Sequence, residues 1–231
     1  MQLSANLGAS RYEYAFDVAG RLQHCSGSVV VFDIGAGEGA MKQPLEAGTH
    51  QWFGFDLEPR GETTRLWDLM YSCPEQEVTP NLVLLLDVIE HLVNPGLALD
   101  NIARVLPPNG HLVITTPNPR WSRSRLWALL RGTPACFTQQ DLDSNGHVFP
   151  VWPHIMEKML RDSGFEIVEY VTLDGRTDWP RGPFSLRYPL RCLVALAMMT
   201  IEKSDRSACG MSYGILAKLR TKSPEPDPAL C

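Results

Sequence analysis

A run of β-branched and apolar residues that ends in closely spaced glycines constrains this chain more than any other feature. The segment VVVFDIGAGEGA, Val29 to Ala40, has the pattern of a buried strand followed by a turn that contains Gly35, Gly37 and Gly39. Glycines at such a turn let the backbone bend sharply and approach a ligand where any side chain would clash. The segment therefore predicts a strand, a ligand-binding turn and the start of an α/β domain.

Strand and helix patterns alternate along the rest of the chain. Further strands are expected at 51–56, 64–67, 82–86, 111–115, 165–173 and 213–219, with helical patterns at 99–106 and 153–163. Continuous apolar runs such as Leu82 to Leu86 are typical of strands covered on both faces, as in a parallel sheet. We therefore expect an α/β fold with a Rossmann-like, doubly wound, mostly parallel seven-stranded sheet, whose ligands bind beyond the carboxyl ends of the strands.

Length and local composition predict the domain organisation. A chain of 231 residues suits one large domain, which we place at 1–222. Two stretches interrupt the alternation, at about 118–151 and 176–206, and we expect them to form an inserted lid and acceptor region. The tail 223–231 contains three prolines and no periodic apolar face. We expect this tail to be disordered.

Charge and cysteine content exclude several classes of protein. The net charge of −5, from 26 acidic and 21 basic residues, provides no overall positive field for a nucleic-acid partner. The six cysteines form no CxxC pair and lie at no zinc-ligand spacing, so we expect neither a bound metal nor a disulfide framework. The chain begins without a signal-peptide pattern, and the apolar run Leu193 to Ile201 is far shorter than the roughly 20 residues of a membrane span. These features predict a cytoplasmic protein without a transmembrane segment.

Acidic residues near the glycine turn discriminate between possible cofactors. Asp56 ends the next strand, 21 residues after Gly35, where a carboxylate can accept hydrogen bonds from two ribose hydroxyls. The glycines alone also fit a dinucleotide. However, Asp33 within the strand needs a cationic or hydrogen-bonding partner, and Glu38 at the turn would repel a pyrophosphate. Both residues favour S-adenosylmethionine, which carries positive charge and no phosphate.

Five segments together resemble the class I S-adenosylmethionine-dependent methyltransferases, in particular the small-molecule branch that includes ubiquinone-biosynthesis-like enzymes. They are DIGAGEG, GFDLEP, WDL, LLLDVIEHLVNP and GHVFPVWPHIMEKMLRDSGFEIVEY. The resemblance implies that the cofactor is S-adenosylmethionine and the product S-adenosylhomocysteine. It implies a methionine site at Asp33, Gly35, Ala36 and Gly37, a ribose site at Asp56 and Leu57, an adenine site at Asp68 and Leu69, and a sulfonium side at Asp87 and Val88.

One spacing departs from the pattern of that family. Only eleven residues separate Asp56 from Asp68, which leaves little room for a helix between the second and third strands. Asp68 is therefore expected either at the adenine ring or in a surface turn.

Methyl transfer from a sulfonium is an in-line displacement, which requires alignment of the acceptor and exclusion of water. A small-molecule acceptor that reacts through a hydroxyl also benefits from a general base, which slightly favours O-methylation here. His147 is the first candidate for this base and His91 the second, although each could instead be structural. Glu90 could orient a base or simply be solvated.

Basic and aromatic residues in the two inserted stretches suggest how an acceptor is held. Arg123 and Arg125, with Trp121 and Asn118, are predicted to bind an anionic acceptor, because guanidinium groups pair with carboxylates and phosphates. A solvated helix face explains the same arginines. Further arginines precede the run Leu193 to Ile201, which is compatible with a helix that contacts a membrane surface or a lipid-linked acceptor, or with a core or dimer helix.

Two other functional classes also fit the pattern. The first is a nicotinamide-dinucleotide-dependent reductase, which would have to accommodate a pyrophosphate next to Glu38. The second is a non-catalytic adenosyl-binding scaffold, which would bind the cofactor without turnover.

Overall fold

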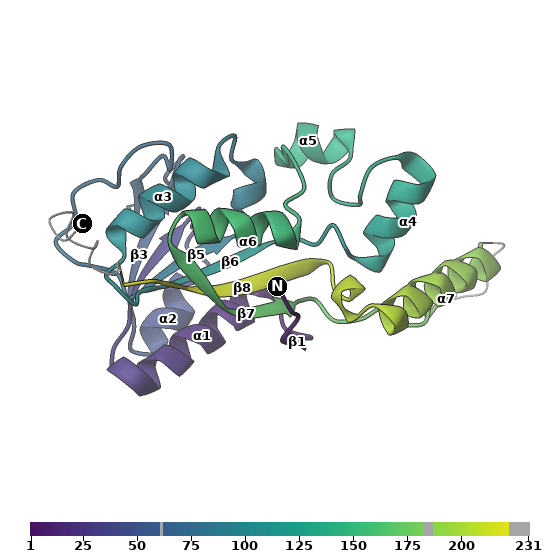
Figure 1. Ribbon diagram of the computed structural model, residues 1–231, viewed down its shortest axis with the longest axis horizontal. Coiled ribbons are helices and arrows are strands. Elements are labelled where there is room, and N and C mark those ends of the chain that lie inside the picture. Colours follow the sequence, from purple (N-terminus) through teal and green to yellow (C-terminus); the bar gives the residue numbers. More distant parts are fainter. Residues whose placement is uncertain (61, 183–186, 222–231) are drawn as a thin grey trace, which may run out of the picture.

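One mixed sheet organises the protein in the computed structural model, which describes residues 1–60, 62–182 and 187–221 (Figure 1). Its strands are β1 (Ala5–Asn6), β2 (Val30–Ile34), β3 (Gln51–Asp56), β4 (Thr64–Leu66), β5 (Leu82–Leu86), β6 (His111–Pro117), β7 (Phe165–Thr172) and β8 (Ser212–Leu219). Their order in the sheet is β1-β7-β8-β6-β5-β2-β3-β4. Strand β8 runs antiparallel to β6 and β7, and the other pairings are parallel.

This topology confirms the expected α/β, doubly wound and mostly parallel sheet. It corrects the number of strands from seven to eight, because the two-residue strand β1 pairs with the edge of β7. Ala5 lies opposite Val171 and Asn6 opposite Thr172. A strand of two residues shows no side-chain periodicity, so no sequence pattern could reveal it.

Helices cover both faces of the sheet. They are α1 (Arg11–Ser26), α2 (Lys42–Ala47), α3 (Pro95–Val105), α4 (Ser122–Arg131), α5 (Gln139–Asn145), α6 (Pro153–Asp162) and α7 (Tyr188–Ser204), with 3-10 turns η1 (Ile89–His91) and η2 (Arg206–Ala208). Figure 1 shows α1 and α2 on one face, and α3 and α6 on the other.

The central strand β5 shows why the apolar runs are continuous. Leu82 and Leu84 pack in the core on the side of α1 and α2, whereas Val83 and Leu85 pack in the core on the side of α3 and α6. All four side chains are fully buried. Because successive side chains of a strand point to opposite faces, a sheet covered on both faces requires apolar residues at every position.

The two inserted stretches are helical and lie at the carboxyl ends of the parallel strands. The stretch 118–151 contains α4 and α5, and 176–206 contains α7, which projects away from the sheet and is followed by η2 (Figure 1). Within the described part of the chain, neither stretch adds a strand. The tail 223–231 lies outside the described residues, as does part of the second stretch at 183–186. Among the described helices, we find none with the length and apolar character needed to cross a membrane.

Candidate functional site

The glycine turn after β2 is held against the end of β3. The backbone N–H groups of Gly35 and Ala36 both donate to the carbonyl of Phe55, at 2.8 and 3.0 Å. The N–H of Gly37 donates to Oδ2 of Asp56 at 2.8 Å. Gly35 and Gly37 have φ angles of 73° and 54°, a region that glycine adopts without the strain of a side chain. Hydrogen bonds therefore fix the glycine turn and the Asp56 carboxylate relative to each other.

A second hydrogen bond fixes the orientation of the Asp56 carboxylate. Its other oxygen, Oδ1, accepts a hydrogen bond from the N–H of Glu58 at 3.0 Å. Each carboxylate oxygen has further lone pairs, so Asp56 can still accept bonds from two adjacent hydroxyls. Leu57 is exposed beside it at the same edge of the sheet. This arrangement suits a ribose, as the resemblance implied.

Asp33 lies within β2, just before the glycine turn, and is only 4% exposed. Its carboxylate accepts a hydrogen bond from Nε1 of Trp52 at 3.0 Å. Burial, with a contribution from the nearby Asp56, raises the pKa of Asp33 to about 6 in spite of that bond. A cationic ligand at the turn would stabilise the ionised carboxylate. Asp33 is therefore suited to the ammonium group of a methionine moiety.

The segment after β4 places Asp68 and Leu69 at the same edge of the sheet. Oδ1 of Asp68 accepts from the N–H of Met70 at 2.9 Å, so Asp68 caps a tight turn. Leu69 is buried, and its carbonyl accepts from Nδ2 of Asn101 at 2.8 Å. The described residues between β3 and β4 form no helix, as the short spacing predicted. The assignment of this turn to an adenine ring stays a prediction.

Asp87 follows β5 with a φ angle of 53°, which is uncommon for a residue with a side chain. Thr115 donates to Oδ1 of Asp87 through its hydroxyl at 2.7 Å, and its carbonyl accepts from the Asp87 N–H at 3.0 Å. Arg11, the first residue of α1, forms an ion pair with Oδ2. The next residue, Val88, packs against Gly35 of the glycine turn. The predicted sulfonium side therefore adjoins the predicted methionine site.

Arg11 was not among the site residues that the sequence predicted. Its position is set by the capping box that starts α1, in which the Ser10 hydroxyl accepts from the N–H of Glu13 and the Glu13 carboxylate accepts from the N–H of Ser10. The pattern S-x-x-E is visible in the sequence and predicts a helix start. It does not reveal that Arg11 reaches an aspartate 76 residues away.

The two candidate bases lie together. The rings of His91 and His147 meet edge to face, with their centroids 5.0 Å apart. Nδ1 of His91 lies 3.1 Å from the carbonyl oxygen of Gly146, and Nδ1 of His147 lies 2.6 Å from that of Cys136. Because a carbonyl oxygen only accepts, Nδ1 is the donor in both contacts, which fixes the orientation of both rings. Burial and the neighbouring His147 lower the pKa of His91, which favours its neutral form.

Glu90 is fully buried, so the alternative of a solvated side chain is wrong. Its Oε2 accepts from the hydroxyl of Thr116 at 2.9 Å. Burial, together with the nearby Asp87, raises the pKa of Glu90 to about 8. Its Oε1 has no hydrogen-bond partner among the described residues. A buried carboxylate in this state favours a proton or a cation nearby.

Glu90, His91 and His147 also form a set of possible metal ligands. One ligand atom from each lies within 4.8 Å of the other two. Two imidazoles and a carboxylate suit a divalent transition metal or zinc. Sequence spacing did not group these residues, because His147 comes from the inserted stretch after α5. The expectation that the chain binds no metal stays a prediction.

A cavity of about 390 Å³ brings the two histidines together with Asp87 and Arg11, and we call it the histidine cavity. It is lined by Arg11, Asp87, His91, Pro117, Cys136, Asn145, His147, Met211 and Ser212. The cavity lies at the carboxyl ends of β5 and β6, where ligands of such sheets bind. Its size and mixed lining suit part of a small organic molecule.

Two of the predicted acceptor ligands have structural partners instead. Asn118 is 1% exposed, and its Nδ2 lies 3.0 Å from the carbonyl oxygen of Ser207 and 3.2 Å from that of Gly210. Arg125 donates from Nε to the carbonyl of Arg120 at 2.8 Å and forms an ion pair with Asp205. Neither residue lines the histidine cavity. These contacts use the amide of Asn118 and part of the guanidinium of Arg125. The role of both residues in acceptor binding stays a prediction.

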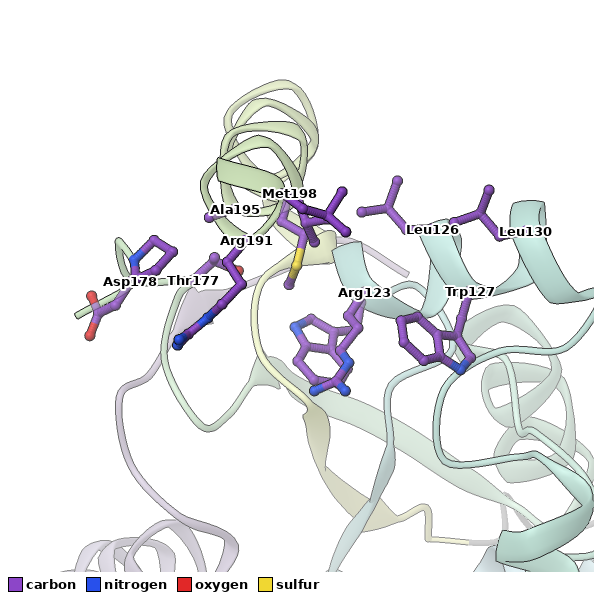
Figure 2. A pocket seen from close by; sticks show the side chains of 13 residues that line it. Arg123, Leu126, Trp127, Leu130, Thr177, Asp178, Arg191, Ala195 and Met198 are labelled. Atoms are coloured by element: carbon purple, nitrogen blue, oxygen red, sulfur yellow. The ribbon is translucent and has the colours of Figure 1, made fainter. Parts of the chain in front are cut away.

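The other two predicted acceptor ligands, Trp121 and Arg123, line a different cavity. It lies between α4 and α7 and has a volume of about 630 Å³ (Figure 2). The structure therefore separates the predicted acceptor residues from the histidines. Asp87, a predicted cofactor residue, lines the histidine cavity, and the α4–α7 cavity shares no lining residue with it.

A glycine turn at β2, followed by acidic residues at the ends of β3 and β5, defines an adenosyl-cofactor-binding α/β domain. Residues 11–170 match the family model described as a methyltransferase domain. Because the match covers well over half of the chain, the protein belongs to this methyltransferase-domain family. This finding confirms the resemblance, and with it S-adenosylmethionine as the cofactor of the class. It gives no support to a dinucleotide-dependent reductase.

Curated relatives match part of the chain. It is 32% identical over 114 residues to the ubiquinone biosynthesis O-methyltransferase of Bradyrhizobium diazoefficiens, a match that covers 44% of this chain and 45% of the relative. It is 28% identical over 119 residues to the enzyme of the same name from Nitrobacter winogradskyi, covering 46% and 45%. The chain thus spans less than half of the length of these relatives.

Solved structures share the fold at lower identity. A SAM-dependent methyltransferase from Archaeoglobus fulgidus aligns with 90% of this chain and 95% of its own, with a TM-score of 0.59 and 19% identity. The magnesium protoporphyrin IX methyltransferase of Synechocystis, solved with bound S-adenosylhomocysteine, aligns with 91% and 84%, with a TM-score of 0.54 and 16% identity. These likenesses confirm the fold class.

Proposed function

We propose that this protein is an S-adenosylmethionine-dependent O-methyltransferase that acts on a small hydroxylated molecule. The observation that carries the proposal is the pairing of His147 with His91, in which the contact of His147 Nδ1 with the Cys136 carbonyl puts the lone pair of a neutral His147 ring on Nε2. Both rings line one cavity with Asp87, on the expected sulfonium side of the cofactor. A general base at this place serves a hydroxyl acceptor, since its proton must leave as the oxygen attacks.

In this mechanism the chain contributes alignment, water exclusion and a base. Bound S-adenosylmethionine supplies an electrophilic methyl group. Asp33, Asp56 and Asp87 would hold the cofactor, and His147 would take up the proton of the acceptor hydroxyl at Nε2 as the acceptor oxygen becomes methylated. Arg11 holds Asp87 in place by their ion pair, so these two residues position the reacting end of the cavity.

The class of acceptor follows from the same cavity and from the relatives. Arg11 brings a guanidinium group, a hydrogen-bond donor with a positive charge, to the lining of the cavity. This donor suits an acceptor with a carboxylate, a phenolate or a second hydroxyl. The relatives named ubiquinone biosynthesis O-methyltransferases support a hydroxylated acceptor. A cytoplasmic location and the absence of a nucleic-acid partner stay predictions.

Two measurements test the proposal. The first is calorimetric titration with S-adenosylhomocysteine and, separately, with NADH, where we expect binding of S-adenosylhomocysteine only. The second is transfer of labelled methyl groups to a panel of phenols and catechols, with and without a carboxylate. We expect turnover on at least one of them, because the cavity combines a base with the cofactor side.

A matched pair of variants separates catalysis from structure. His147→Ala is expected to lower kcat by roughly 100-fold or more, the range of a positioned base, with little change in S-adenosylhomocysteine binding. His154→Ala is the control, because His154 is exposed on α6 and lines no part of the cavity. Equal rates for both variants would remove the base assignment. Cofactor binding without turnover on any acceptor would favour a non-catalytic scaffold.

A further inference from the structure

Helices α4 and α7 carry an apolar surface that the methyltransferase site does not use. Leu129 is 81% exposed and Leu130 is 75% exposed at the end of α4. On α7 the exposed aliphatic side chains are Leu190, Leu193, Val194, Leu196 and Met199. Burying such side chains in water-free surroundings is favourable, so a surface of this kind marks a docking site.

An open cavity continues this surface between the two helices. In Figure 2, Leu126 and Leu130 extend from one side of α4, and Arg123 and Trp127 from the other. Met198 of α7 points into the space between the helices. The lining is mostly apolar, with arginines from both helices. Residues of both helices line this cavity, and we call the exposed side chains of the two helices together the α4–α7 surface.

Side-chain contacts hold the two helices together as a unit. The hydroxyl of Ser122 on α4 donates to Glu202 of α7 at 2.7 Å, and both side chains are buried. Arg125 of α4 forms an ion pair with Asp205, which follows α7. The α4–α7 surface is therefore anchored to the carboxyl edge of the sheet, the edge at which the histidine cavity also lies.

The charge of this surface is opposite to that of the whole protein. Exposed arginines surround it at positions 123, 131, 181, 187 and 191. Helix α4 contains no acidic residue, and the only acidic residue of α7, Glu202, is buried against Ser122 and Thr177. Asp178 is an exposed carboxylate at the rim of the cavity. A positive surface on a chain of net charge −5 is selective for an anionic partner.

Tryptophans accompany the arginines. Two guanidinium groups face the Trp127 ring. The Cζ atom of Arg123 lies 5.1 Å from the ring centroid, and that of Arg131 lies 4.6 Å from it. Trp179, beside the cavity, is 48% exposed. Tryptophan rings and arginines are enriched where a protein meets the headgroup layer of a membrane.

We propose that the α4–α7 surface docks on a lipid bilayer that contains anionic headgroups. In this arrangement α7 lies in the plane of the interface, with its leucines among the acyl chains and its arginines at the phosphates. A second copy of the chain is the other possible occupant. A two-fold contact would bring the same arginines of both copies together without exposed carboxylates on α4 or α7 to neutralise them, and the like charges would repel.

Docking in this way would place the carboxyl edge of the sheet at the membrane. The histidine cavity lies at the same edge, so docking would favour an acceptor with a hydrocarbon tail. The inference itself concerns binding and does not require the proposed methyl transfer. A vesicle experiment without cofactor or acceptor therefore tests it separately.

The test is co-sedimentation of the purified chain with vesicles of phosphatidylcholine alone, or mixed with phosphatidylglycerol. We expect partitioning to the mixed vesicles that weakens with added salt, because exposed charges are screened. Arg187→Gln with Arg191→Gln should lower the partition coefficient roughly 25-fold, about fivefold for each charge near the surface. Leu129→Ser with Leu193→Ser should lower it at least about tenfold.

Matched controls keep the test specific. Arg60→Gln with Lys158→Gln removes two exposed charges elsewhere, and Leu66→Ser with Val168→Ser removes two exposed apolar side chains from strands. Both controls should bind vesicles as the wild type does. Absence of vesicle binding, or equal losses in test and control variants, overturns the proposal. A dimer in solution that Leu129→Ser with Leu193→Ser dissociates, seen by analytical ultracentrifugation, would assign the surface to a second copy instead.

Discussion

Gly35 and Val88 approach each other so closely that a Cβ atom at residue 35 would lie 2.3 Å from Cγ2 of Val88. Gly35 also has a φ of 73°, which a residue with a side chain adopts only with strain. Two segments separated by more than fifty residues thus meet where the methionine and sulfonium parts of the cofactor are expected. This contact gives Gly35 a role that its place in a glycine pattern does not explain alone.

Gly35→Ala should therefore destabilise the protein by roughly 2–5 kcal/mol, from backbone strain plus overpacking against Val88. Gly20→Ala is a suitable contrast, because Gly20 lies within α1 and an added Cβ would meet nothing within 4 Å. That variant should gain about 0.5–1 kcal/mol from helix propensity. Chemical denaturation measures both changes. Combining Gly35→Ala with Val88→Ala should recover part of the loss, and no recovery would exclude the clash.

The raised pKa of Asp33 predicts a pH dependence of cofactor binding. Burial raises this pKa to about 6, so the carboxyl is ionised above that pH and becomes protonated as the pH falls through it. Only the ionised form pairs with the ammonium group of the ligand. Affinity for S-adenosylhomocysteine should therefore fall up to about tenfold per pH unit below 6. Calorimetry at pH 5, 6 and 7.5 measures this dependence.

Asp33→Asn supplies the control for that experiment. The raised pKa means that this carboxyl stabilises the unliganded fold when protonated, and that this contribution is lost as the pH rises through about 6. The amide keeps an acceptor for Trp52, so the variant should be at least as stable as the wild type at pH 7.5. Its binding of S-adenosylhomocysteine should be weaker and independent of pH. A variant with unchanged affinity would contradict the role of Asp33.

Asp56→Asn should weaken binding of S-adenosylhomocysteine by on the order of 100-fold. The carboxylate accepts from the N–H groups of Gly37 and Glu58, and an amide NH₂ at either oxygen position would face one of these donors. Loss of charge also weakens the expected ribose contacts, each worth about 1.5–3 kcal/mol. Glu58→Gln keeps the backbone donor and should bind normally. Calorimetry on both variants distinguishes the ribose role from a general effect on the edge of the sheet.

Asn118→Ala should lower stability by roughly 2–4 kcal/mol without changing the KM for the acceptor. Its buried amide donates to backbone carbonyls of Ser207 and Gly210, which would lose their partner. Gln140→Ala, at an exposed position of α5, should change stability by less than about 0.5 kcal/mol. Thermal unfolding and steady-state kinetics measure the two effects. A raised KM with unchanged stability would restore the original interpretation of Asn118 as an acceptor ligand.

Local patterns were sufficient for most of the sheet. The apolar run of β5 and the glycine turn after β2 each carry their signal within a few residues, because burial on both faces and a sharp turn are local requirements. The edge strand β1 was missed because two residues show no periodicity. The helices of the inserted stretches were not assigned in detail, since α4 and α5 are short and lie outside the alternating strands and helices.

The candidate site likewise contains residues that local segments predicted and contacts that only the fold creates. Asp33 and Asp56 were expected at the cofactor because one lies within and the other ends a strand next to the glycine turn, and Asp87 was expected there from the resemblance of its segment. The contact of His91 with His147, the ion pair of Arg11 with Asp87 and the burial of Glu90 join segments far apart in the chain. No local pattern reports such contacts.

The sequence by itself determined the fold class, the cofactor class and the residues at the ends of the central strands. Only the tertiary structure decided which of the remaining polar residues act together. Asn118 bonds to backbone carbonyls and Arg125 pairs with Asp205, and neither lines the histidine cavity, whereas Arg11 of α1 does. The physical reason is that hydrogen bonding and burial depend on which groups packing brings within about 3 Å, and that distance is set by the whole fold.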